Sequence, residues 1–213
     1  MSNVSRQSHS CLPAATMETL KPLAELCAPD ERQSSFSVRD SVTPGFRPIK
    51  IDDIYDRAAS IKLHAGVPEQ IRSHFAASQN LLAFSWYYYP FNVTAQFLAY
   101  VSVESALKAR YPGGKRPSFR GLVRRAVRQG LVKDSGFSHI QEAEERASTM
   151  EQAWYQQQQQ VTPYVEVLIE TMPSLRNSLA HGEYMLHMHG ATHVRICAEF
   201  INQLFSEPSP NDG

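Results

Sequence analysis

Apolar side chains recur every three or four residues along most of the chain beyond Ile49, which is the spacing of one buried helix face. No sustained alternation of apolar and polar residues predicts a sheet. Strong breakers, among them Pro90, the run Tyr111-Pro-Gly-Gly and Gly182, separate the periodic stretches. The pattern predicts helices over residues 50–64, 67–89, 92–110, 118–130, 137–160, 162–181 and 191–205.

The helix ends carry their own signals. Asn92, Ser118 and Thr162 stand directly before apolar stripes, and their side chains are good N-caps. Pro173 falls within the predicted helix 162–181 and is expected to bend it. Together these signals predict an all-α, up-and-down helical bundle over residues 49–207.

Residues 1–48 differ from the rest because serine and proline are frequent and the one apolar cluster, Leu20 to Leu26, is interrupted by Pro22. This composition predicts a flexible tail with one helical turn near Thr16–Cys27. A segment that folds onto a partner would have the same composition. Residues 208–213 are expected to be a disordered C-terminus.

Composition and charge narrow the class of protein. The 213 residues carry 21 Lys+Arg and 21 Asp+Glu, so no overall field draws the chain to nucleic acid or membrane. Three cysteines without a CxxC pair, and no apparent secretory signal, favour a reduced cytoplasmic location. Residues 73–103 lack charge but are interrupted by polar residues, so two core helices separated at Pro90 explain them better than a membrane span. No nucleotide-binding loop or other cofactor motif is present.

The strongest local signal is the octapeptide 175–182, Leu-Arg-Asn-Ser-Leu-Ala-His-Gly. An arginine followed at once by asparagine, and five residues after the arginine by histidine, is expected by chance roughly 0.02 times in a chain of this composition. Arg176, Asn177 and His181 are therefore singled out as candidate site residues.

This octapeptide resembles the R-N-x-x-x-H signature of the HEPN superfamily, helical-bundle proteins common in prokaryotic toxin–antitoxin and antiviral systems. A looser resemblance extends over the rest of residues 66–206, including the predicted helix 92–110 and the basic segment that follows it. The resemblance implies a metal-independent endoribonuclease without cofactor, with Arg176 and His181 catalytic and Asn177 supporting them. It also implies RNA as substrate, a homodimer, and an antitoxin or other regulatory partner.

The residue types make physical sense of that chemistry. Histidine transfers protons near neutral pH, and arginine presents a charged planar fork to phosphate oxygens. Asparagine can hold the histidine tautomer or bond to the substrate. The expected route is attack by the ribose 2′-hydroxyl, leaving a 2′,3′-cyclic phosphate. Many HEPN-like proteins keep the fold without activity, so a non-catalytic module that binds RNA, nucleotide or a partner protein is the alternative.

Spacing constrains the motif. On a regular helix Asn177 and His181 share a face, whereas Arg176 is rotated by about 140° from His181. Arg176 then reaches the same pocket only through its length or a local distortion, and one motif holds one histidine. Both points favour a two-fold dimer that brings two motifs to one cleft. The structural alternative is that Arg176 and Asn177 form caps or ion pairs while His181 packs on its helix end.

A basic stretch between residues 108 and 133 holds nine of the 21 basic residues and no acid. It is equally consistent with RNA contact and with a solvated face paired to the acidic stretch 142–151. The candidate RNA-binding residues are Arg116, Arg120, Arg124, Arg125 and Arg128, with Tyr111 and Phe119 available to stack on bases.

Two further groups need an explanation. Glu104 lies in an otherwise uncharged stretch of helix and is expected to pair with Lys108, Arg176 or another base, either as a simple ion pair or as a supporting residue that orients Arg176. His187, His189 and His193 have metal-like spacing but no complete ligand set nearby, which favours a loop without metal.

Overall fold

The computed structural model describes residues 18–40, 42–113, 117–147, 162–182 and 189–206. Within these ranges the chain forms seven α-helices, three short 3₁₀-helices and one two-stranded sheet. The all-α bundle predicted from the apolar periodicity is therefore confirmed, with a small hairpin added to it.

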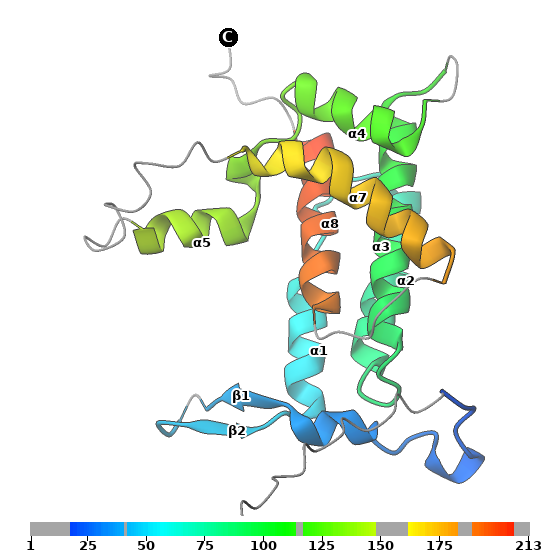
Figure 1. The fold of residues 1–213 in the computed structure, drawn as a ribbon, viewed down its shortest axis with the longest axis vertical. Helices are drawn as coiled ribbons and strands as arrows, with labels where there is room; N and C mark the ends of the chain where they lie inside the picture. The colour runs from blue at the N-terminus through cyan, green and yellow to red at the C-terminus, as the bar shows by residue number, and fades with distance from the viewer. Residues whose placement is uncertain (1–17, 41, 114–116, 148–161, 183–188, 207–213) are drawn as a thin grey trace, which may run out of the picture.

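The centre of the bundle is α3, Phe91–Arg110, a 20-residue helix that packs most extensively against α8, Gly190–Phe205, and α2, Glu69–Phe84. A shorter helix, α1, Ile51–Ser60, packs on α2. These four helices run along the long axis of the molecule (Figure 1). Small residues of α3, among them Ala95, Ala99 and Ala106, are fully buried, which lets the neighbouring helices approach closely.

Two helices cross one end of the bundle (Figure 1). They are α4, Phe119–Arg128, and α7, Tyr164–Ala180, which pack against each other and against α3. Between them in sequence, α5, Ser138–Ala147, projects to the side (Figure 1). This arrangement brings the motif at the end of α7 close to α3 and to the basic helix α4.

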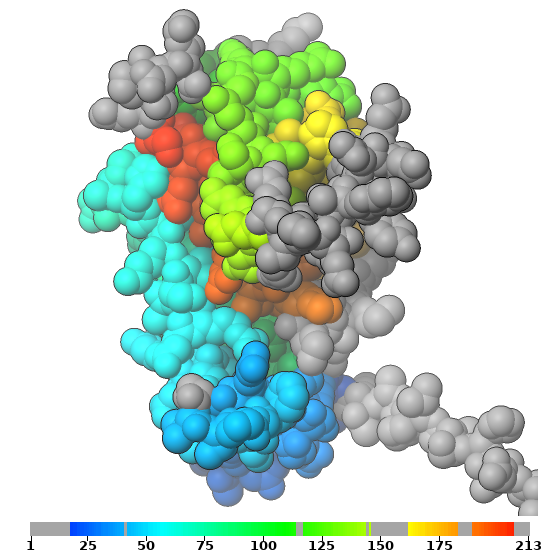
Figure 2. Space-filling view, turned by 90° about the vertical axis from the view of Figure 1, so that its left-hand side faces the viewer, coloured from blue at the N-terminus to red at the C-terminus, as the bar shows by residue number. Residues whose placement is uncertain are grey.

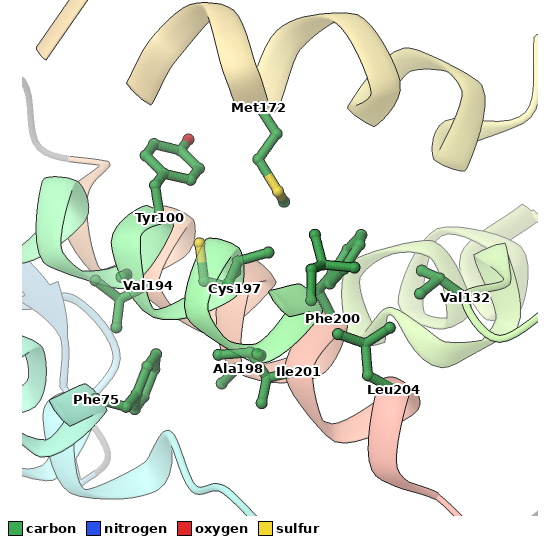
Figure 3. Packing of buried hydrophobic residues seen from close by; sticks show 14 of the residues in the cluster. Phe75, Tyr100, Val132, Met172, Val194, Cys197, Ala198, Phe200, Ile201 and Leu204 are labelled. Atoms are coloured by element: carbon green, nitrogen blue, oxygen red, sulfur yellow. The ribbon is translucent and has the colours of Figure 1, made fainter. Parts of the chain in front are cut away.

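The core joins both parts of the fold. Figure 3 shows Met172 of α7 reaching toward Cys197 and Phe200 of α8, while Tyr100 of α3 lies beside them. Phe75, Cys197 and Phe200 have no exposed surface, and Met172 is 1% exposed. Full burial of a side chain of this size contributes about 1.5–3 kcal/mol, so α7 is held by its apolar face and not by its charges.

Of the two N-caps predicted for α3 and α4, one is confirmed and one is wrong. Ser118 is confirmed as the N-cap of α4, since its hydroxyl accepts a hydrogen bond from the backbone N–H of Gly121 at 3.2 Å. Asn92 is not a cap: α3 already begins at Phe91, and the Asn92 amide donates to the carbonyl of Tyr89 at 3.1 Å. The prediction failed because Pro90, with its fixed φ, lies in helical conformation and starts the helix earlier.

The start of α7 is capped from a distance. The two carboxylate oxygens of Asp134 accept hydrogen bonds from the backbone N–H groups of Tyr164 and Val165, each at 2.9 Å. Thr162, the predicted cap, precedes the helix without this role, and Pro163 occupies the N-cap position. Pro173 lies inside α7, which runs unbroken through it.

The N-terminal segment, residues 18–50 apart from Ser41, is the main correction to the sequence prediction. In place of a flexible tail it forms 3₁₀-helices η1, Leu23–Glu25, and η2, Glu31–Ser35, followed by strands β1, Ser37–Arg39, and β2, Phe46–Pro48. The strands pair antiparallel, with Val38 opposite Arg47. Figure 2 shows the segment covering the lower end of the bundle beside α1.

Polar contacts, which composition does not reveal, attach this segment. The Asp30 side chain is 6% exposed and accepts hydrogen bonds from the Tyr89 backbone N–H at 2.8 Å and from the Arg32 guanidinium. Gln33 donates from Nε2 to the Ser85 carbonyl at 2.9 Å. The predicted turn near Thr16–Cys27 corresponds to η1, and residues 1–17 lie outside the described ranges.

The other helix boundaries agree with the periodicity to within a few residues, apart from the overextended end of 67–89. Residues 148–160 of the predicted helix 137–160 lie outside the described ranges, as do residues 208–213. The uncharged stretch 73–103 is divided, as predicted, into α2 and α3 with Pro90 between them. Among the described helices, none is long and apolar enough to cross a membrane.

Candidate functional site

The motif occupies the end of α7. Arg176 and Asn177 lie in its last helical turns, and His181 is the C-cap residue, with φ −91° and ψ 3°. Gly182 follows with φ +76°, a conformation that strains any residue with a Cβ atom, so the glycine fixes where the helix stops. His181 is therefore exposed at a helix end and not packed into the core.

Glu104 of α3 pairs with two cations. Its Oε2 atom lies 2.8 Å from an Nη atom of Arg176, and its Oε1 atom accepts a hydrogen bond from Lys108 at 2.6 Å. The carboxylate side chain is only 14% exposed, whereas that of Lys108 is 59% exposed. A mostly buried carboxylate is stable only with such partners. Of the partners expected from sequence, Glu104 binds both Lys108 and Arg176.

The pair of Glu104 and Arg176 sets the direction of the guanidinium. The other Nη atom of Arg176 donates to the Asn177 side-chain oxygen at 3.2 Å. Its Nε atom is buried and, within the described residues, has no hydrogen-bond partner. An unpaired buried N–H costs about 1–3 kcal/mol, so this Nε–H is a cost of the arrangement that holds the guanidinium beside Glu104.

The motif lines an open cleft of about 630 Å³ between α7, α3 and the start of α4. Arg176, Asn177 and His181 all contribute to its walls, together with Glu104 and Arg120. We call this hollow the motif cleft. The helical rotation of about 140° between Arg176 and His181 does not separate them, because the long arginine side chain bends toward α3.

Residues of α4 that the motif search did not reveal form the facing wall of the motif cleft. Ser118 and Phe119 lie at the N-terminal end of α4, and Ser174 and Ser178 add hydroxyls from α7. Phe119, named from sequence only as a stacking candidate, is thus placed beside the motif. No pattern in the sequence brings residues 118 and 176 together, because their proximity depends on α4 packing across α7.

The basic residues divide into two groups. Arg120 and Arg124 pair with the two oxygens of Glu170 in α7, at 3.0 and 3.3 Å. The acid that these two arginines contact is therefore Glu170 of the neighbouring helix. Of the acidic stretch 142–151 that the sequence offered, residues 148–151 lie outside the described ranges. These exposed pairs contribute little to stability, since surface ion pairs are worth about 0–1 kcal/mol.

The remaining arginines of the set lie elsewhere. The Arg125 guanidinium lies 4.2 Å from the ring centroid of Tyr111, whose hydroxyl donates to Gln129 at 2.7 Å. Arg128 is exposed, and Arg116 lies outside the described ranges. Of the four predicted RNA-binding arginines that the structure describes, Arg120 is the one that lines the motif cleft.

The histidines after the motif do not assemble a metal site in the part of the chain that the structure describes. His193 lies 3.0 Å from the Tyr100 hydroxyl through Nδ1, and His189 precedes α8, whereas His187 is outside the described ranges. Within those ranges there is no group of three or more His, Cys, Asp and Glu side chains that would hold a metal ion. Burial raises the pKa of Tyr100, so its hydroxyl stays protonated near neutrality.

Comparisons with known proteins gave no match: no family model, no curated protein and no solved structure is significantly similar to this chain. The HEPN resemblance therefore depends on the octapeptide and on the weaker pattern around it.

Proposed function

We propose that the protein is a metal-independent endoribonuclease whose active site is the motif cleft. One observation supports this best: Arg176, which a regular helix rotates by about 140° from His181, nevertheless lines the same open hollow as Asn177 and His181. A proton-transfer group and a phosphate-binding cation at one cleft are the minimum that RNA cleavage without metal requires.

The chemistry assigns a role to each residue. His181 accepts the proton of a ribose 2′-hydroxyl, whose oxygen then forms a bond to the adjacent phosphorus. Arg176 stabilises the added negative charge on the phosphoryl oxygens, and Asn177 holds the arginine or the ribose. The bond from phosphorus to the 5′-oxygen breaks, and that oxygen takes up a proton. The products are a 2′,3′-cyclic phosphate and a free 5′-hydroxyl.

The leaving oxygen needs a second proton donor. We assign the role of this proton donor to His181, in its protonated form, of a second copy of the chain. Each motif holds one histidine, so a two-fold dimer would supply both the proton acceptor and the proton donor. Arg120, Ser118 and Phe119 lie on the wall facing the motif, where they would contact the RNA backbone and a base. Glu104 acts as a positioning residue for Arg176, and Lys108 pairs with the other oxygen of the Glu104 carboxylate.

The resemblance adds a biological setting to this proposal: a defence or toxin–antitoxin system in which a regulatory protein restrains the nuclease. A co-expressed antitoxin would cover the motif cleft. Growth of cells that overproduce the wild-type chain or the His181→Ala variant tests this setting, with arrest expected for the wild type alone.

The experiment is RNA cleavage by purified protein in the presence of EDTA. His181→Ala is expected to lower the rate by about 10²–10⁴-fold, the range for loss of a general acid or base. Arg176→Ala should also abolish cleavage. Arg72→Ala, which removes an exposed arginine of α2 outside the cleft, is the matched control for Arg176→Ala and should retain the wild-type rate. Cleavage by His181→Ala at the wild-type rate would overturn the mechanism.

A non-catalytic binding module is the second candidate. The observation in its favour is that Glu104 and Glu170 already neutralise Arg176 and Arg120, which weakens their pull on phosphate. Such a module would bind RNA, nucleotide or a partner protein at the motif cleft. Saturable RNA binding without cleavage, lost in Arg176→Ala, is the result that favours it.

A further inference from the structure

A second hollow lies at the other end of α3, between the N-terminal segment and the bundle. It encloses about 440 Å³, within the range of pockets that hold small molecules. Its walls come from η2, β1, α1, the end of α2 and the start of α8. We call it the N-terminal pocket. Asn92 lines this pocket and Glu104 the motif cleft, which separates them by about 18 Å along α3.

The N-terminal segment that covers the N-terminal pocket is attached to the bundle by specific hydrogen bonds. Gln33 is 5% exposed and reaches the Ser85 carbonyl, and Asp30 receives the Tyr89 backbone N–H. The Ile49 backbone N–H donates to the Phe36 carbonyl at 3.1 Å, which closes the segment on itself. A hollow framed by buried hydrogen bonds keeps its shape without a ligand, so binding would cost little reorganisation.

One side of the pocket favours a flat apolar group. Phe36 and Tyr89 stack with ring centroids 5.5 Å apart and an interplanar angle of 19°, and both line the hollow. Val38, Ile54 and Leu82 complete this apolar wall. Aromatic walls of this kind pack best against another planar ring.

The other side favours a negative charge. Among the residues that line the pocket there is no aspartate or glutamate, whereas Arg57 of α1 is present and forms no ion pair within the described ranges. Ala191 and Thr192, in the first turn of the 16-residue helix α8, also line the pocket, and together with Arg57 they line the neighbouring hollow. The positive end of the helix dipole adds to the arginine charge there.

We propose that the N-terminal pocket binds a small aromatic molecule with a single anionic group, with the ring against Phe36 and Tyr89 and the anion at Arg57. This site is separate from the motif cleft and does not depend on the proposed nuclease activity. It gives the N-terminal segment a function, since that segment supplies Phe36, which stacks on Tyr89 from the turn between α2 and α3.

The test is a fluorescence titration of the full chain with the aromatic sulfonate 1-anilinonaphthalene-8-sulfonate. We expect saturable binding of one molecule per chain. Arg57→Gln should weaken it by about tenfold, the value of a charge-assisted contact. Val38→Trp, which fills the hollow, should abolish it. Arg72→Gln removes an exposed arginine of α2 outside the pocket and should bind as the wild type does.

Competitors define the ligand class. Salicylate and adenosine 5′-monophosphate carry a ring with a carboxylate or a phosphate, and displacement of the probe by one of them identifies the head group. Decanoate, with an aliphatic body, should compete poorly. Equal affinity of the wild type and Arg57→Gln, binding that Val38→Trp retains, or displacement by decanoate in preference to both aromatic competitors would each overturn the proposal. Circular dichroism of each variant verifies that the helices remain folded.

Discussion

The two hollows at opposite ends of α3 differ in what holds them open. The motif cleft has charged side chains in its walls: Glu104 paired with Arg176, and Arg120, whose ion-pair partner Glu170 lies outside the lining. The N-terminal pocket is walled mainly by rings and aliphatic side chains and roofed by a segment attached through buried hydrogen bonds. Charged walls adapt to a polymer that slides past them, whereas a fixed apolar hollow selects a small molecule by shape.

The first prediction compares one substitution in the motif cleft with one substitution in the N-terminal pocket. His181→Ala should reduce RNA cleavage by about 10²–10⁴-fold and leave binding of the aromatic sulfonate unchanged. Val38→Trp should do the reverse. The measurements are the rate of cleavage of a labelled RNA and the affinity for the aromatic sulfonate, each determined for both variants. Loss of both functions in either variant would show that the two ends of the bundle are coupled.

The second prediction concerns the charged wall alone. Glu104→Ala releases Arg176 and is expected to slow cleavage by about 10- to 100-fold through misplacement of the guanidinium. Lys108→Ala, which removes the more exposed partner of the same carboxylate, should change the rate less than threefold, as expected of an exposed ion pair. Single-turnover kinetics separate the two, since a positioning effect lowers the maximal rate more than RNA affinity. Equal effects of the two variants would contradict the role of Glu104.

The third prediction concerns the roof. Asp30→Ala leaves the Tyr89 backbone N–H without its acceptor and removes one of the two carboxylates that pair with the Arg32 guanidinium, the other being that of Glu18, so it should destabilise the fold by about 1–3 kcal/mol. Urea denaturation measures the loss, and Asp52→Ala, which changes an exposed carboxylate of α1, is the control. If the two variants are equally stable, the N-terminal segment is not anchored as described.

The smallest expected effect is the pH dependence of the free energy of unfolding in the acid range. Hydrogen bonds from Arg47 lower the pKa of Asp53 from 3.8 to about 2, and this pair joins β2 to α1. Because the folded-state pKa is the lower one, the pair stabilises the fold above about pH 4, and its contribution is lost as the pH falls toward 2. Urea midpoints between pH 5 and 2.5 should fall less steeply in Asp53→Asn. Parallel pH profiles of this variant and the wild type would contradict the assignment.

Sequence reasoning reached the helices because each one buries a periodic apolar stripe, as α7 does through Val165, Leu168 and Met172. It also predicted that Glu104 pairs with Lys108, Arg176 or another base, since an isolated carboxylate on a near-core helix requires a partner, and the structure shows both named pairs. Features of this kind can be predicted from sequence because they depend on the pattern of residues within a short stretch of chain.

The N-terminal segment was missed for the opposite reason. Its attachment depends on single long-range bonds, such as Asp30 to the Tyr89 backbone, between residues 59 positions apart. The N-terminal pocket likewise draws its wall from Phe36, Leu82 and Thr192, which share no motif. The facing wall of the motif cleft was hidden in the same way, because Ser118 and Phe119 meet Arg176 only through helix packing.

The remote cap on α7 has a consequence for how this chain can vary. Asp134 fixes the first turn at Tyr164 and Val165, so the helix cannot rotate freely about its axis. Each residue inserted or deleted between this anchor and Arg176 would swing the guanidinium by about 100° around the axis, away from Glu104. The interval of 12 residues from Tyr164 to Arg176 therefore has a fixed length, and any insertion or deletion within it is expected to separate Arg176 from Glu104.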